Sequence, residues 1–328
     1  MKTPKMSVCV VTARPGGIDV LISGLCRQEF TDFEVVLVDA LYHRRKEVVA
    51  DKFAEAKIEL RHIPPRQRLF PIDACPQALN AAIAKARGEL LLWGVDYSFF
   101  PPKCLSEHWG VYEYFNKQRF GMGAHRYLYP KVQLAYELPS YAPMKMSRPH
   151  EQEGVTYSYS EEASRQFASD IEAGVYDVNM YSIFHPPLVS PGQIEILPED
   201  PLFFHADPKL SGLIGGKLSG DFMHCKNESI SRQLMLDVNG FNEDFISHLY
   251  DDTDVGHRLE HAGAEWVLLD SVATVLIVNP RHMFPHLVRR GEMTSQRVLY
   301  ESRKSDGACV RSSNQYDLGS FGGVPWWY

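Results

Sequence analysis

Two short segments of this 328-residue sequence hold carboxylates in positions suited to chemistry. The first is GELLLWGVDYSFFPP (88 to 102), where Asp96 follows an apolar run and precedes Pro101 and Pro102. A carboxylate at the end of a buried strand can hold Mg²⁺ or Mn²⁺ against a diphosphate, because these ions take oxygen ligands from one or two carboxylates and from substrate phosphates. An aspartate that caps a turn before a proline-rich loop gives the same pattern, so this segment alone leaves both interpretations open.

The second segment is YDDTDVGHRL (250 to 259), which places Asp251, Asp252 and Asp254 within one helical turn. The helix dipole favours acidic residues at a helix start, but it explains all three poorly. Three adjacent negative charges repel one another, so a cation, an arginine such as Arg258, or a raised pKa must offset them. A carboxylate with a raised pKa beside a crevice is a candidate general base.

Two histidines follow the last predicted strand in IVNPRHMFPH (277 to 286). Imidazole is a common metal ligand, although a histidine after a strand is often only a surface residue. We take His282 as a candidate second metal ligand, with His286 as its substitute if the register differs.

Short β-branched runs alternate with amphipathic stretches over the first 125 residues and must position these groups. Strands are predicted at 7 to 13, 33 to 40, 58 to 63 and 89 to 95, with helical spacing at 18 to 25 and 78 to 86. This alternation predicts parallel strands joined by right-handed crossovers and covered by helices on both faces. Ligands collect beyond the carboxyl ends of such strands, so we expect residues 12 to 17, Asp39 and Asp96 to line one crevice.

The pattern changes from residue 126 to 217, which reads as a long irregular insertion with one helix-like stretch at 161 to 174. Helical spacing returns at Ile230, Leu234 and Val238, and Asn239-Gly240 supplies a left-handed stop. A helix is predicted over 251 to 263, followed by strands at 265 to 269 and 272 to 278. The last forty residues are polar and rich in Gly and Ser.

Composition narrows the class of protein. The chain is 45% hydrophobic with a formal charge of -7, which fits an enzyme-sized globular protein and disfavours one that coats duplex nucleic acid. Its six cysteines form no CxxC pair and read as reduced core residues. We find no signal-peptide pattern and no apolar segment of about 18 residues, so we expect a soluble, cytoplasmic enzyme without a transmembrane segment.

The sequence resembles family-2-type glycosyltransferases of the GT-A fold over residues 7 to 125 and 218 to 285. SVCVVTARPGG is similar to the opening strand and nucleotide loop, VVLVDA to the second strand, and ALNAAIAKARGELLLWGVD to the stretch that ends in the family's DxD metal motif. The segment from Cys225 to Gly263 is the most specific match. It is similar to the acceptor-side motif that is also seen in the galactosyltransferase C-terminal module.

The resemblance implies an α/β, GT-A-type fold, with a mostly parallel central sheet between helices and an inserted irregular or helical segment. It divides the chain into a nucleotide-sugar-binding half (1 to 125), an acceptor-side insertion (126 to 217), an acceptor and catalytic half (218 to 285) and a tail (286 to 328). The residues it implies for the donor side are Thr12, Ala13, Arg14, Asp39 and Asp96. It also implies Asp96 and His282 as metal ligands, Asp252 as the catalytic base, and Asp251 as the first member of the family's acidic pair.

Two positions depart from the family pattern. Gly94 stands where the family has the first Asp of DxD, and Asp251 stands where it has Glu. The first departure leaves open how strongly the chain depends on metal.

The implied activity is an inverting, metal-assisted transfer of a sugar from a nucleoside-diphosphate sugar to a hydroxyl group. Mn²⁺ or Mg²⁺ is the implied cofactor, and UDP is favoured by family habit. The acceptor stays open between a saccharide, a lipid-linked glycan, a protein and a modified nucleic-acid base, as do the donor sugar and the oligomeric state. Two alternatives remain. One is a glycosyltransferase-like binding module without catalysis. The other is a sugar nucleotidyltransferase, although TARPGG (12 to 17) of this chain matches the basic, Gly-rich phosphate loop of such enzymes only in part.

Overall fold

The computed structural model describes residues 2–12, 17–65, 75–128, 203–204, 218–220, 223–245, 250–277, 299–300, 311–314 and 316–321. Its main sheet has the strand order β3-β2-β1-β4-β8. The first four positions are taken by parallel strands: β1 (Met6–Thr12), β2 (Phe33–Asp39), β3 (Glu59–Ile63) and β4 (Leu90–Val95). The short strand β8 (Ser229–Ser231) pairs antiparallel with β4 and closes this side of the sheet.

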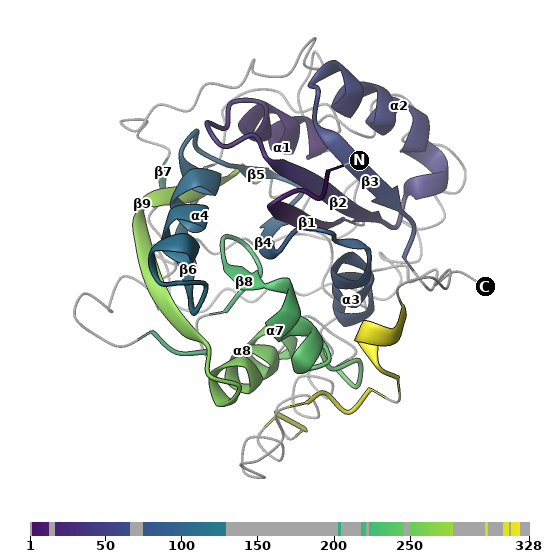
Figure 1. The fold of residues 1–328 in the computed structure, drawn as a ribbon. Coiled ribbons are helices and arrows are strands. Elements are labelled where there is room, and N and C mark those ends of the chain that lie inside the picture. The colour runs from purple at the N-terminus through teal and green to yellow at the C-terminus, as the bar shows by residue number, and fades with distance from the viewer. Residues whose placement is uncertain are drawn as a thin grey trace, which may run out of the picture.

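Helices cover both faces of the main sheet (Figure 1). Right-handed crossovers carry the chain from β1 to β2 and β3 in one direction, so α1 (Ile18–Leu25) and α2 (Tyr42–Glu55) lie on one face. The return to β4 places α3 (Cys75–Lys85) on the other face. The strands are near-continuous apolar runs because both of their faces are covered. The strand order therefore reverses between β1 and β4, which makes this the topological switch point of the sheet.

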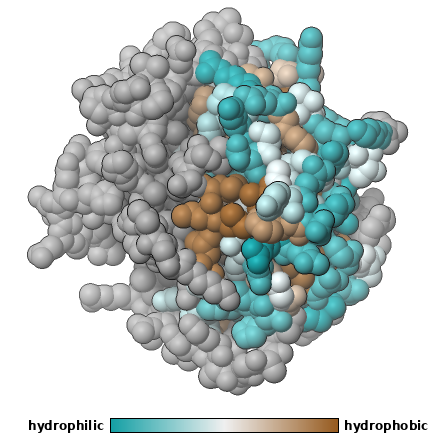
Figure 2. Space-filling view, turned by 60° about the vertical axis from the view of Figure 1, so that its left-hand side comes forward, coloured by the Kyte–Doolittle hydropathy of each residue, from teal (hydrophilic) through white to brown (hydrophobic). Residues whose placement is uncertain are grey.

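A second sheet has the order β5-β9-β6-β7 and packs against helix α4 (Cys104–Tyr114). Its strands are β5 (Ser98–Phe99), β9 (Glu265–Ile277), β6 (Arg119–Leu128) and β7 (Phe203–Phe204). Figure 2 brings forward the side on which Figure 1 shows α4, β6 and β9, and apolar residues gather in the middle of that face. The other described elements are α7 (Arg232–Asp237), α8 (Asp251–His261) and the 3-10 helix η3 (Leu318–Phe321). None of the helices described here is long and apolar enough to cross a membrane.

The predicted architecture, α/β with a mostly parallel central sheet and flanking helices, is confirmed. The four predicted strands of the first half and the predicted helices at 18 to 25, 78 to 86 and 251 to 263 are all present to within a few residues. The stop at Asn239-Gly240 is confirmed too, since both residues have positive φ, 59° and 66°. The helix-like stretch at 161 to 174 lies outside the described residues.

Two predictions about secondary structure are wrong. Ile230 lies in β8 rather than in a helix, because Ser231 caps α7: its Oγ accepts from the Leu234 amide at 3.0 Å. The two strands predicted between 265 and 278 are one strand, β9, which pairs with β6 from Glu265 to Leu269 and again from Thr274 to Ile277. A register shift between Gly123 and His125 of β6 absorbs the irregularity. Through β8, the segment after residue 217 also supplies a strand to the sheet built by the first half.

Candidate active site

The carboxyl ends of the parallel strands bring three of the sequence-predicted residues to one edge of the sheet, which we call the carboxyl edge. Thr12 ends β1, Asp39 ends β2, and Asp96 directly follows β4. The Thr12 hydroxyl donates to Asp96 Oδ2 at 2.6 Å, and both residues are buried. This hydrogen bond joins β1 to the end of β4, so Asp96 lies at the switch point, where sheets of this kind hold their ligands.

Asp39 is fully buried and forms an ion pair with the guanidinium of Arg45. Arg45 of α2 donates from Nε to Asp39 Oδ2 at 2.7 Å and from Nη2 to Oδ1 at 2.8 Å. The Leu41 amide donates to Oδ1 at 2.8 Å, and His62 Nε2 lies 2.9 Å from Oδ2. Burial alone would raise the pKa of Asp39, but Arg45 and His62 outweigh it and hold the pKa at about 2.

This arrangement bears on the predicted contact between Asp39 and a nucleotide. Each oxygen of its carboxylate already has two partners, so a nucleotide could contact Asp39 only by replacing one of them. Nη2 of Arg45 also lies 3.2 Å from Thr12 Oγ1. The three side chains thus form one connected group that ends on Asp96.

At two positions of the carboxyl edge, the space available explains why the residue is glycine. Gly17 precedes α1 with a φ of 91°, and a Cβ there would come within 3.3 Å of the Asp96 backbone and side chain. Gly94 lies in β4, and a Cβ there would come within 2.5 Å of the Phe100 ring. The family's first DxD aspartate is therefore excluded by the packing of Phe100, unless that ring moves.

The predicted metal ligands are described only in part. His282 and its substitute His286 lie outside the described residues, as do Ala13 and Arg14, which were predicted for the donor side. Among those that are described, no group of three or more His, Cys, Asp or Glu side chains could hold a metal ion. Asp96 offers one hard oxygen donor, which fits Mg²⁺ or Mn²⁺ when a diphosphate supplies further oxygens.

A second set of groups lies in the segment that ends in the antiparallel strand β8. Leu92 pairs with Ser229, and the Trp93 amide donates to the Glu228 carbonyl at 2.8 Å. The residues before β8 then pair with β6: Glu228 forms an antiparallel bridge with Met122, and the Gly123 amide donates to the Asn227 carbonyl at 2.7 Å. The buried Glu228 carboxylate orders them by accepting from the amides of Lys226 at 2.7 Å and Asn227 at 3.0 Å.

His224, in the segment before β8, contacts the acidic start of α8. Its Nδ1 lies 3.6 Å from Asp252 Oδ2. The side chain of Asp252 is 24% exposed, whereas Asp251 and Asp254 are both buried. Burial would raise the pKa of Asp252, but the hydrogen bond and charge of His224 lower it.

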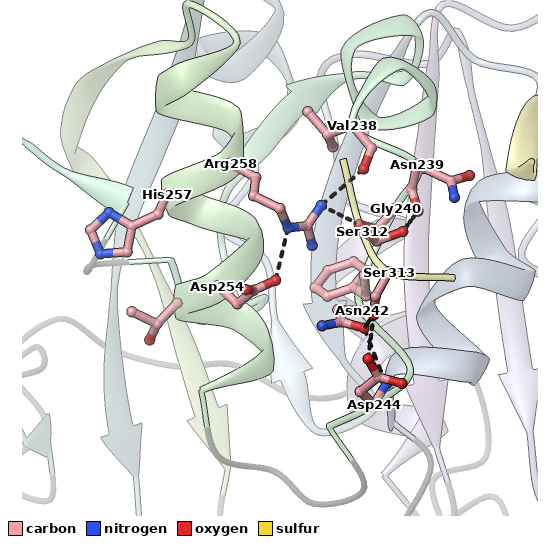
Figure 3. A network of polar contacts seen from close by, with 12 residues as sticks. Val238, Asn239, Gly240, Asn242, Asp244, Asp254, His257, Arg258, Ser312 and Ser313 are labelled. Carbon is pink, nitrogen blue, oxygen red and sulfur yellow. Dashed lines mark hydrogen bonds and ion pairs between the residues drawn. The ribbon is translucent and has the colours of Figure 1, made fainter. Parts of the chain in front are cut away.

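The other two aspartates of this turn have different partners. Asp254 Oδ2 accepts from Arg258 Nε at 2.8 Å, and Arg258 Nη1 donates to the carbonyls of Val238 at 2.9 Å and Gly240 at 2.8 Å (Figure 3). Asp251 is only 3% exposed, and burial together with the Asp252 charge raises its pKa well above the ordinary value. The mutual repulsion expected from the sequence is thus offset by an arginine, a histidine and a raised pKa, one for each carboxylate.

The structure also places residues that the sequence did not single out. Residues 311–314 pack along the turn after α7: Ser312 Oγ donates to the Asn239 carbonyl at 2.8 Å and Ser313 Oγ to Asn242 Oδ1 at 2.5 Å (Figure 3). Asn314 Nδ2 donates to the Phe241 carbonyl at 2.8 Å. This part of the predicted tail therefore fixes the turn that follows α7.

Comparison with known proteins gave matches only among solved structures. No protein-family model and no curated protein matches the sequence. A fragment of TarS from S. aureus, solved with UDP-GlcNAc, is similar at 15% identity and a TM-score of 0.48 over 91% of this chain and 66% of that one. The chain spans only 37% of the longer TarS structure.

Two further structures are similar at the level of the chain trace. The mannosyltransferase PcManGT from Pyrobaculum calidifontis, solved with GDP-Man and Mn²⁺, has 12% identity and a TM-score of 0.44 over 98% of this chain and 79% of its own. GalNAc-T7, solved with UDP, GalNAc and Mn²⁺, has 10% identity and a TM-score of 0.49 over 85% and 44%. The solved structures named here are thus glycosyltransferases.

Proposed function

We propose that the chain is an inverting glycosyltransferase that moves a sugar from a nucleoside-diphosphate sugar to an acceptor hydroxyl. One observation supports the proposal: the half of the chain that holds Asp96 and the half that holds Asp252 contribute strands to one sheet, because β8 pairs with β4. Thr12 donates to Asp96 at the switch point, and His224, in the segment before β8, contacts Asp252. A donor carboxylate and a base are the two protein groups that a direct displacement at an anomeric carbon needs.

On the donor side, Asp96 and His282 would hold Mn²⁺ or Mg²⁺, which supplies stabilisation of the charge that develops on the leaving diphosphate. We propose Thr12, Ala13, Arg14 and Asp39 for the nucleotide side, where the nucleotide would replace one of the present partners of Asp39, and UDP is the proposed nucleotide. The glycine at position 94 has a steric cause, because Phe100 occupies the space that a side chain there would need.

On the acceptor side, Asp252 is the proposed base. It is partly exposed and faces His224, which would take part in orienting the carboxylate as it accepts the proton of the acceptor hydroxyl. The hydroxyl oxygen then bonds to the anomeric carbon as the bond to the diphosphate breaks on the opposite face, which inverts the configuration. Asp251, buried beside Asp252, would hold the acceptor. The acceptor is a hydroxyl on a saccharide, a lipid-linked glycan, a protein or a modified nucleic-acid base, and we propose that the enzyme acts in the cytoplasm.

The test is release of nucleoside diphosphate from a panel of UDP- and GDP-sugars, with Mn²⁺ and with EDTA, followed by NMR of the product's anomeric configuration. Asp252→Asn keeps the shape of the side chain but cannot accept the proton, so we expect turnover to fall by roughly 10²-fold or more. Glu260→Gln is the matched control. Glu260 lies on the same helix, is 27% exposed, and its Oε2 lies 3.5 Å from a histidine nitrogen, that of His257.

The outcomes separate the parts of the proposal. Wild-type release that stops in EDTA, falls in Asp252→Asn and persists in Glu260→Gln supports all of it. No release from any donor contradicts the assignment of a glycosyltransferase. Equal loss in both variants, or a retained anomeric configuration, contradicts the role of Asp252 and the inverting mechanism.

A further inference from the structure

We propose that Arg45 and Thr12 are positioning residues for Asp96: Arg45 fixes the direction of the Thr12 hydroxyl proton, and that proton fixes the Asp96 carboxylate. The inference rests on the proposed role of Asp96 in holding the metal and the donor diphosphate. It begins from one unbroken run of contacts, from Asp39 through Arg45 and Thr12 to Asp96. Neither Arg45 nor its place in α2 is part of the sequence resemblance.

The direction of each hydrogen bond follows from the chemistry of the groups. A threonine hydroxyl has one proton and two lone pairs, and a guanidinium can only donate. At the 3.2 Å contact with Arg45 Nη2, Thr12 Oγ1 must therefore accept. Its single proton is left for Asp96 Oδ2, at the 2.6 Å distance of a charge-assisted bond.

Burial makes this arrangement rigid. The side chains of Arg45 and Asp39 are both 0% exposed, so the guanidinium is held by a two-point contact that water does not compete for. His62 and the Leu41 amide take the remaining positions on Asp39. Arg45 can then turn only at the expense of buried charge pairing, which fixes its Nη2 against Thr12.

A hydroxyl at the other end of the same strand provides a matched control. Ser7, on β1, accepts from the Gly88 amide at 2.8 Å and donates to Glu34 Oε1 at 2.8 Å. Like Thr12, it is a buried hydroxyl that accepts one N–H and donates to one buried carboxylate. Loss of Ser7 should therefore match loss of Thr12 in its structural effect without touching Asp96.

The experiment measures the Mn²⁺ enhancement, which is the ratio of the UDP Kd without Mn²⁺ to that with Mn²⁺, by isothermal titration calorimetry on the full chain. GDP replaces UDP if the release assay selects it. We expect Thr12→Val to lower the enhancement about 10-fold, as loss of an outer-shell partner does, and Thr12→Ser to retain it. Ser7→Ala should leave the Mn²⁺ enhancement unchanged. We expect its melting temperature to fall by about as much as that of Thr12→Val.

Arg45→Lys tests whether Arg45 acts through Thr12. Lysine keeps the charge but cannot make the two-point contact and reach Thr12 together, so we expect the enhancement to fall about 10-fold here too. The double variant Thr12→Val/Arg45→Lys should also lose about 10-fold rather than about 100-fold, because both changes act on one hydroxyl. Circular dichroism and thermal melting establish that each variant is folded. If Arg45→Lys does not fold, the Thr12 and Ser7 variants decide the question.

Asp96→Asn separates this inference from the proposed function. If Asp96→Asn abolishes the Mn²⁺ enhancement but Thr12→Val keeps the wild-type value, the positioning role is wrong and the metal role of Asp96 stands. Fully additive losses in the double variant overturn the action of Arg45 through Thr12. If the wild type shows no Mn²⁺ enhancement, or Asp96→Asn retains it, the metal role and this inference both fail.

Discussion

Both ends of the parallel sheet carry a hydroxyl on β1 and a buried carboxylate on β2 with arginine partners, but the two groups lead to different contacts. At the amino edge, where the strands begin, Ser7 of β1 donates to the buried Glu34 of β2, and the side chains of Arg61 and Arg87 donate to Glu34 at 2.9 and 2.7 Å. At the carboxyl edge, Thr12 of β1 and Asp39 of β2 are joined by Arg45.

The difference is what the hydroxyl contacts. Ser7 donates to the same carboxylate that its neighbouring arginines hold, so the amino-edge group closes on itself. Thr12 donates instead to a second carboxylate, Asp96, at the switch point. A buried carboxylate with arginine partners thus joins the strands at one edge, and at the other the corresponding group leads to Asp96, the carboxylate that we propose for the donor site.

The largest effect we expect on stability comes from the amino edge. Glu34→Gln removes the charge that two arginines share, and the loss is moderated because their side chains stay 34% and 23% exposed. We expect the free energy of unfolding to fall by about 3 kcal/mol in urea denaturation, with the turnover of folded protein unchanged. A variant that keeps its stability but loses turnover would break the division between the two edges.

At the carboxyl edge, we expect Asp39 to make the largest contribution to the loss of folding free energy at acid pH. Its pKa is about 2, below the ordinary 3.8, so its contribution is present above pH 4 and is lost as the pH falls from about 4 toward 2. The shift corresponds to about 2 kcal/mol. Denaturation at several pH values should show a flatter acid limb for Asp39→Asn than for the wild type, and an unchanged slope would contradict the ion pair.

Gly94 offers a test of the missing DxD aspartate. Gly94→Asp must displace the Phe100 ring, because a Cβ would come within 2.5 Å of it. We expect a loss of about 2 kcal/mol in the free energy of unfolding, typical of overpacking, and no gain in Mn²⁺ affinity. Tighter Mn²⁺ binding in a stable variant would show that the family's motif can be restored here.

The smallest effect has the opposite sign. The raised pKa of Asp251 favours folding at low pH, and this contribution is lost as the pH rises through that pKa. Asp251→Asn removes the cost of an ionised, buried carboxylate, so at a pH above that pKa we expect the free energy of unfolding to rise by about 1 kcal/mol in urea denaturation, with a higher KM for the acceptor. Destabilisation at that pH would show that Asp251 serves the fold rather than a site.

The sequence predicted those elements whose periodicity is set by burial, and it missed groups whose role depends on contacts. The strands and Asp39 and Asp96 at their ends were predicted because parallel topology alone brings them together. Arg45 was missed among the charged residues that open α2, although Arg45, Val49 and Phe53 are spaced by four and are all buried. That spacing was the available signal.

Other groups carried no such signal. His224 lies in a segment without periodicity, and its contact with Asp252 joins positions that local patterns do not connect. Ile230 fitted the helical spacing by coincidence, since it lies one residue before the Ser231 cap. The contacts of residues 311 to 314 with the turn after α7 join positions about 70 residues apart, a separation that local patterns do not reach.

The contrast between the two edges is tested most directly by thermal shift on three proteins, the wild type, Asp96→Asn and Glu34→Gln, each with UDP or GDP and with or without Mn²⁺. Ligand that binds the native state raises its melting temperature, whatever the starting stability. We predict a Mn²⁺-dependent rise in the wild type and in the less stable Glu34→Gln, and none in Asp96→Asn. A rise that persists in Asp96→Asn or disappears in Glu34→Gln would contradict the assignment of chemistry to the carboxyl edge, as would a wild type that neither nucleotide stabilises.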